Sequence, residues 1–211
     1  MTTLNDLERR TFRAARDDGL FDVMMAAFLS MFALAPLLSD SLGDFWSSAI
    51  FGPIWYVTYL VMRFTRERVV APRLGTIEPG GDRKARLRRV NLILLGVNSL
   101  ALAVGIAASA GWLSNRVDLA GLTYPITLGF AGLVIFSLVA YSTSTGRYAV
   151  YGLLVALAPL AGELLWQNDK ATHHGFPIAF GSVSTIIFSV GILRFVTLIR
   201  RHPLPDQTAA V

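Results

Sequence analysis

The acidic and histidine side chains beside long apolar segments are the residues of this sequence that could do chemistry. Glu163 lies one turn inside the end of an apolar run, and His173 and His174 follow in the next connection. Carboxylates and imidazoles that converge can bind a cation or relay protons. A charge in hydrocarbon costs about 2.5–3.5 kcal/mol on insertion scales, so Glu163 needs a compensating partner. These three residues are therefore a candidate intramembrane polar site. The alternative is that Glu163 reaches the interface beside Trp166 and lies in water.

Asp22 is a second candidate for this kind of site, one turn into the first apolar segment. Asp18 and Asp22 are four residues apart, which in a helix would place both on one face. Acidic pairs at a cytoplasmic boundary can hold Mg²⁺ for diphosphate chemistry, as in membrane prenyltransferases. That chemistry needs a second Asp-rich cluster, which no predicted inner segment supplies. The favoured interpretation is that Asp22 pairs with a nearby Arg.

The short motifs that mark common catalytic sites do not occur in this sequence. We find no P-loop, no G-x-G-x-x-G, no H-E-x-x-H and no G-x-S-x-G, and there is no Cys for thiol chemistry. This leans against an enzyme without deciding the question. The sequence assigns no cofactor and leaves the metal question open, because adjacent His residues have no diagnostic ligand spacing.

The elements that must position these residues are apolar segments long enough to cross a bilayer. Of 211 residues, 54% are hydrophobic and only 16% are charged, with a mean hydropathy of +0.53. A spanning helix takes roughly 20 residues and satisfies its own backbone in lipid. We predict an all-α membrane protein, a bundle of six transmembrane helices at 20–39, 45–63, 90–110, 122–141, 148–166 and 177–197.

The distribution of cations predicts the orientation of these spans. Every Lys and Arg except Arg116 and Lys170 falls on one side of the six segments. Cytoplasmic loops carry the excess of basic residues, so both termini are predicted to be cytoplasmic. The chain then divides into an interfacial amphipathic segment at 1–19, a transmembrane domain at 20–197 with a basic cytoplasmic loop at 64–89, and a cytoplasmic tail at 198–211.

The basic loop at 64–89 is the most distinctive polar segment. Within it, 69–77 reads as an extended piece interrupted by Pro72 and Gly75. Cations beside an anionic leaflet contribute about 1 kcal/mol each. The loop could therefore hold lipid headgroups or a soluble partner, while simple topological anchoring is the favoured alternative. The candidate lipid or partner contacts are Arg73, Arg83, Lys84, Arg86, Arg88 and Arg89.

Uncharged polar residues inside the spans are predicted to bond their own backbone or a neighbouring helix. In the last span these include Ser182 and Ser184. Gly181, Thr185 and Ser189 recur every four residues there, and we interpret them as a small-residue ridge for helix packing.

Three short motifs carry a resemblance to a known group of proteins. They are Asp18-Gly19-Leu20-Phe21-Asp22, Pro72-Arg73-Leu74-Gly75 and Arg200-Arg201-His202-Pro203-Leu204-Pro205. With them the chain resembles uncharacterised prokaryotic six-helix integral membrane proteins. The resemblance implies a membrane-embedded bundle without an established activity, so no functional residue is carried over from it.

The leading hypothesis is a non-enzymatic multi-pass membrane protein, either a small transporter-like bundle or the membrane subunit of a larger assembly, with unknown cargo. The alternative is an intramembrane enzyme acting on a lipid or isoprenoid substrate. The expected partners are membrane lipids with anionic headgroups at the cytoplasmic face, and a second copy or a protein partner. Nucleic acid is not expected, since the charge sorts by membrane side. The expected location is the bacterial cytoplasmic (inner) membrane.

Overall fold

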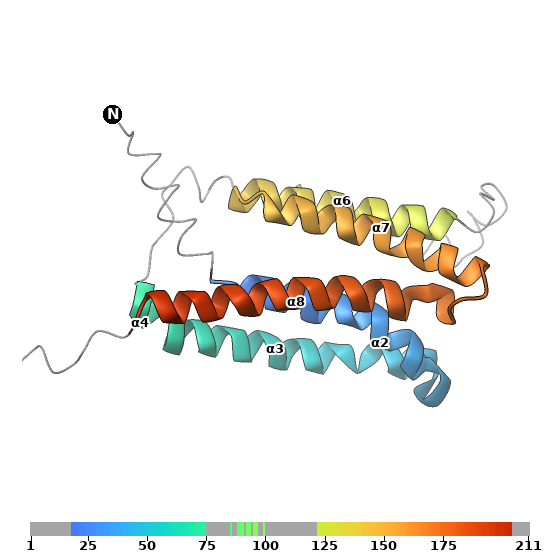
Figure 1. Ribbon diagram of the computed structural model, residues 1–211, viewed down its shortest axis with the longest axis horizontal. Helices are drawn as coiled ribbons and strands as arrows, with labels where there is room; N and C mark the ends of the chain where they lie inside the picture. Colours follow the sequence, from blue (N-terminus) through green and yellow to red (C-terminus); the bar gives the residue numbers. More distant parts are fainter. Residues whose placement is uncertain are drawn as a thin grey trace, which may run out of the picture. The chain divides into compact units, whose positions relative to one another are not determined.

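The computed structural model describes residues 18–74 and 122–203, together with positions 85, 88–90, 92, 93, 95, 96 and 99 (Figure 1). These residues form helices and turns, and no strand occurs among them. The longer helices are α2 (Leu20–Ala49), α3 (Phe51–Thr65), α6 (Thr123–Thr143), α7 (Arg147–Gln167) and α8 (Phe176–Arg201). The short ones are the π-helix η1 (Arg66–Val70), α4 (Ala71–Leu74) and the 3₁₀ turn η2 (His173–Gly175).

Five helical segments of the described residues are long and apolar enough to cross a membrane, and each coincides with one of the six predicted spans. These are Leu20–Gly43, Phe45–Arg73, Tyr124–Thr143, Arg147–Gln167 and His173–Arg201. The all-helical fold class is therefore confirmed, and five of the six predicted spans coincide with these apolar helical segments. The third predicted span at 90–110 lies outside the described residues except for scattered positions, as do the segments 1–17 and 204–211. The orientation of the termini stays a prediction.

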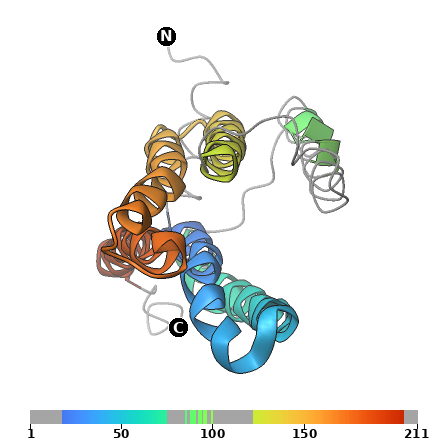
Figure 2. The ribbon, with the colours of Figure 1, turned by 90° about the vertical axis from the view of Figure 1, so that its right-hand side faces the viewer.

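The chain divides into two compact units. The first comprises Met1–Glu78 and Phe176–Val211, and the second comprises Pro79–Gly175. Among the described helices, α2, α3, α4 and α8 belong to the first unit, while α6 and α7 pair in the second. Within the first unit, α2 lies between α3 and α8 (Figure 2).

The contact between α2 and α8 forms the core of the first unit. Ala26, Leu29, Phe180 and Ile187 are all at most 2% exposed. The hydroxyl of Ser184 donates a hydrogen bond of 2.8 Å to the Ala26 carbonyl across the two helices, as predicted for polar groups in these spans. Such interhelical bonds add to van der Waals packing, which drives helix association in lipid.

Two glycines let the two helices approach closely where α2 begins. Gly19 has φ = 75°, which disfavours a side chain, and a Cβ there would overlap the Gly191 carbonyl. A Cβ on Gly191 would lie 2.9 Å from the Val23 backbone nitrogen and 3.0 Å from the Gly19 carbonyl. Since backbone atoms cannot give way as a flexible side chain can, the contact requires glycine at both positions.

The connection between the first two predicted spans is a bend at Gly43, whose φ of 75° and ψ of 162° interrupt α2. Beyond the bend, α2 leads directly into α3. Trp55 lies in the middle of a span, an unusual place for Trp. Its ring packs edge-on against Phe28 there, with the ring centroids 4.4 Å apart. This contact fixes α3 beside α2.

The extended segment predicted at 69–77 is wrong for residues 69–74, which are helical. The π-helix η1 shifts the backbone register just before Pro72. Pro72 then occupies the second position of α4, where a missing N–H leaves no broken hydrogen bond. The Arg73 guanidinium donates a 2.6 Å hydrogen bond to the Val69 carbonyl and so satisfies one backbone acceptor.

The packing of α2 on α8 predicts that Gly191→Ala destabilises the protein. The new methyl group must displace backbone atoms, and overpacking of this kind costs about 1–3 kcal/mol. Gly181→Ala on the same helix is the control, because a Cβ there would meet only Ala33 at 3.8 Å. Thermal unfolding in detergent, followed by circular dichroism, should show a lower midpoint for Gly191→Ala alone. Equal midpoints would contradict the close contact.

Candidate functional site: a carboxylate paired with an imidazole

The candidate site lies in the second unit, where α7 ends and the chain turns back in η2. The last turn of α7 is closed by Asn168, whose side-chain amide donates to the Leu164 carbonyl at 2.7 Å. The backbone N–H of Lys170 donates to the Leu165 carbonyl at 2.9 Å. These bonds satisfy carbonyls that a helix end would otherwise leave open.

A glycine pair brings the returning chain against α7. A Cβ on Gly162 would lie 2.7 Å from the His174 carbonyl, and a Cβ on Gly175 would overlap the Gly162 carbonyl. His173, His174 and Gly175 have φ values of 51°, 52° and 63°. The two histidines thus hold a left-handed conformation that L-residues rarely adopt, a kind of strain that clusters at functional sites.

The carboxylate of Glu163 accepts hydrogen bonds on both oxygens. Its Oε2 is 2.9 Å from His174 Nδ1, and its Oε1 accepts from Gln167 Nε2 at 3.1 Å. Glu163 and Gln167 are one helical turn apart on α7, so that face of the helix supplies both the acid and one donor. A buried carboxylate with two partners avoids most of the penalty of an unpaired charge.

The two members of the pair differ strongly in their access to solvent. The Glu163 side chain is 4% exposed, whereas the His174 side chain is 56% exposed. The ring of Trp166 covers part of the imidazole, with centroids 4.2 Å apart and planes tilted by 39°. The alternative that Glu163 lies in water beside Trp166 is therefore wrong, because its carboxylate is buried and the His174 imidazole is the exposed member of the pair.

The structure places the other predicted site residues as follows. His173 precedes His174 in η2 and is half-buried, while Asp22 belongs to the first unit and is fully buried, with 0% exposure. In the described parts of the chain, no group of three or more His, Cys, Asp or Glu side chains is arranged to hold a metal ion.

The shared helix face proposed for Asp18 and Asp22 is wrong, because α2 begins only at Leu20. Gly19 turns the chain with its positive φ and leaves Asp18 outside the helix. Asp18 Oδ1 accepts the Leu20 N–H at 3.1 Å, and its Oδ2 lies 3.9 Å from Arg66 Nη2. An aspartate just before a helix commonly satisfies an open backbone N–H in this way.

Three of the basic-loop candidates lie within the described residues. Arg73 bonds the Val69 carbonyl, while Arg88 and Arg89 are helical and exposed. Arg83, Lys84 and Arg86 lie outside the described residues, so the predicted contact of this loop with lipid or a partner stays a prediction.

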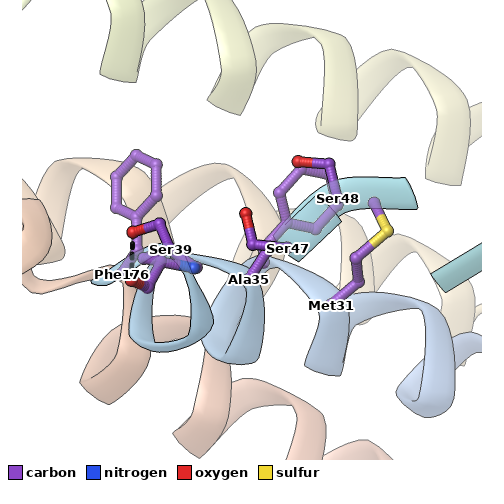
Figure 3. A pocket seen from close by; sticks show the side chains of 8 residues that line it. Met31, Ala35, Ser39, Ser47, Ser48 and Phe176 are labelled. Carbon is purple, nitrogen blue, oxygen red and sulfur yellow. Dashed lines mark hydrogen bonds between the residues drawn. The ribbon is translucent and has the colours of Figure 1, made fainter. Parts of the chain in front are cut away.

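Sequence reasoning missed a cavity of about 380 Å³ in the first unit (Figure 3). Met31, Phe32 and Phe176 line it together with the side chains of Ser39, Ser47 and Ser48. The Ser39 hydroxyl is occupied by a 2.6 Å hydrogen bond to the Pro36 carbonyl. The available signal was the run of serines on both sides of Gly43, but only the bend brings them to one cavity.

No family model matches the chain, and no curated protein or solved structure matches it. The geometry of the described residues therefore carries the functional argument.

The contact between Glu163 and His174 predicts energetic coupling between the two positions. In a double-mutant cycle, Glu163→Gln and His174→Gln should show a coupling of about 1–2 kcal/mol in the free energy of unfolding. The matched cycle of Glu163→Gln with His173→Gln should give a smaller value. Denaturant titration in mixed micelles measures both, and additive effects at 163 and 174 would exclude the paired geometry.

Proposed function

We propose that this protein is a non-enzymatic multi-pass membrane protein, a small transporter-like bundle whose Glu163–His174 pair exchanges protons at one membrane face. The single observation that carries the proposal is the pair itself, a buried carboxylate bonded to a half-exposed imidazole. An imidazole can take up or release a proton near neutral pH and pass it to a hydrogen-bonded carboxylate. Buried ionisable groups in membrane helices commonly belong to such proton relays.

The position of the pair supports a relay open to one side of the membrane. Glu163 lies in the last turns of the α7 span, and His174 lies in the 3₁₀ turn η2, among the first residues of the next apolar segment, His173–Arg201. The proton would enter from water through His174. Asp169 and Lys170 are the charged residues between α7 and η2. The cavity lined by Ser39, Ser47 and Ser48 contains neither of the two buried acidic residues, Glu163 and Asp22, in its lining. We therefore do not propose this cavity as the binding site for a transported substrate.

The proposed location is a bacterial cytoplasmic membrane with both termini inside. Support comes from the end of the first unit where α2 begins. Arg66 lies near Asp18 there, and the Cβ of Arg194 lies against Gly19, so cations from η1 and α8 gather at one end of that unit. This is the arrangement that the positive-inside rule requires.

A membrane-subunit role is the second candidate, favoured by the outer face of α8. Thr185 and Ser189 of the predicted small-residue ridge are exposed, and their hydroxyls bond carbonyls of α8 itself at 2.8 Å. Small residues permit close approach of another helix, so this face suits a neighbouring subunit. The intramembrane enzyme gains no comparable observation.

Proton flux into liposomes tests the leading proposal. We expect the protein, reconstituted with a pH-sensitive dye inside and a K⁺/valinomycin potential, to acidify the lumen faster than empty liposomes do. Glu163→Gln and His174→Gln should lower the rate to that of empty liposomes, because either change breaks the relay.

His173→Gln is the matched control for this experiment, since it changes an imidazole in the same turn and should leave the flux unaltered. A wild-type rate equal to that of empty liposomes would reject the transporter proposal and favour the membrane-subunit role. A flux that survives Glu163→Gln would show that protons move without this pair.

A further inference from the structure

We propose that a pocket between the start of α2 and the end of α3 binds the phosphate-bearing headgroup of a single phospholipid. The pocket has a volume of about 270 Å³ and lies wholly within the first unit. We call it the headgroup pocket. This inference does not depend on the Glu163–His174 pair, which belongs to the second unit.

The side chains that line the headgroup pocket change from apolar to cationic from the interior of the span toward the end of α3. On α2, Leu20 and Met24 line it, and Met24 lies one turn further into the span. On α3, Tyr59 is the deepest lining residue, Arg63 is one turn nearer the helix end, and Arg66 follows. A phospholipid has the same order, with acyl chains deepest, ester groups next and phosphate nearest the water.

The two arginines have the chemistry to bind phosphate. Their side chains are 62% and 51% exposed, at the end of the span where headgroups lie. Each guanidinium has five N–H donors in a planar fork, so it can keep a carboxylate partner and still donate to phosphate oxygens. Tyr59, one turn deeper, adds a hydroxyl at the depth of the ester groups.

The backbone supports this placement of Arg66. It is the first residue of the π-helix η1, where the wider turn changes the direction of side chains relative to α3. Asp18, which is 2% exposed, lines the same pocket and lies 3.9 Å from the Arg66 guanidinium. At that distance the carboxylate orients the guanidinium without occupying all of its donors.

Charge balance around the headgroup pocket selects among phospholipids. Each of the two lining arginines has a carboxylate partner: Arg63 bonds Glu67 at 2.8 Å, and Arg66 lies beside Asp18. Arginines that already have carboxylate partners attract an anionic headgroup less than unpaired arginines would. This arrangement suits a zwitterionic headgroup, whose phosphate meets the arginines while its ammonium lies near Glu67. The exposed pair of Arg63 and Glu67 is weak enough to rearrange around it.

The apolar lining distinguishes a lipid from free phosphate. Leu20, Phe21 and Met24 form one wall, and Met62 contributes from α3. A free phosphate ion would lose hydration against these side chains and gain nothing from them. A phospholipid places its glycerol and upper acyl carbons there. The lining of the pocket therefore favours a phospholipid over a free phosphate ion.

Native mass spectrometry of the detergent-solubilised protein tests the proposal. The probes are dioleoylphosphatidylethanolamine, dioleoylphosphatidylglycerol, dioleoylglycerol and inorganic phosphate. We expect one tightly held phosphatidylethanolamine per protein, weaker binding of phosphatidylglycerol, no retention of dioleoylglycerol and no displacement by millimolar phosphate. The double variant R63Q/R66Q should weaken the first lipid by roughly tenfold, because both charge-assisted contacts are lost.

Two further variants make the result specific. R68Q is the matched control, since Arg68 is on the same helix but lies 5.4 Å over the Phe64 ring and does not line the pocket. E67Q removes one anion and should shift the preference toward phosphatidylglycerol. Circular dichroism verifies that each variant is folded. Equal retention in R63Q/R66Q and R68Q, or equal retention of dioleoylglycerol, would overturn the headgroup site, and an unchanged preference in E67Q would overturn the charge-balance argument.

Discussion

Every polar group within a bilayer must find its partner inside the protein, and this constraint governs the described structure. The hydroxyls of Ser182, Thr185 and Ser189 bond carbonyls of their own helix, and Ser184 reaches across to α2. The same requirement explains Glu163, whose two carboxylate oxygens accept from His174 and Gln167. A carboxylate without those donors would not remain buried at the end of a span. The pairing of Glu163 with His174 and Gln167 therefore follows from the lack of water in the bilayer as well as from the chemistry of the side chains.

Close backbone contacts at glycines bring the polar groups and their hydrogen-bond partners together. Gly19 against Gly191 seats the start of α2 on α8, and Gly162 against Gly175 returns the chain onto α7. In the second case the contact places His174 within hydrogen-bond distance of Glu163. The left-handed φ of His174 is maintained because the surrounding contacts fix the turn. Packing and the site chemistry are thus joined in one short segment.

Hydropathy and charge predicted the spans well because a spanning helix depends on the composition of about 20 residues rather than on any one of them. Local details were harder to predict. Asp18 falls outside α2 because Gly19 adopts a positive φ, and residues 69–74 stay helical because η1 adjusts the register before Pro72. Adjacent histidines look equivalent in sequence, and only the turn decides that His174 bonds Glu163. The headgroup pocket needs α2 and α3 to pack side by side, with Asp18 beside Arg66, and hydropathy does not specify that contact.

The hydrogen bond between Glu163 and His174 is the central claim, and solid-state NMR in lipid bilayers measures it directly. The sequence has three His residues, so His173→Gln and His202→Gln leave a single imidazole to label with ¹⁵N. With ¹³C in the Glu carboxylates, rotational-echo dephasing should place one carboxylate carbon within about 4 Å of the imidazole Nδ1, as a hydrogen-bonded pair requires. The signal should vanish in Glu163→Gln. Absence of dephasing in the protein that retains Glu163 would contradict the account.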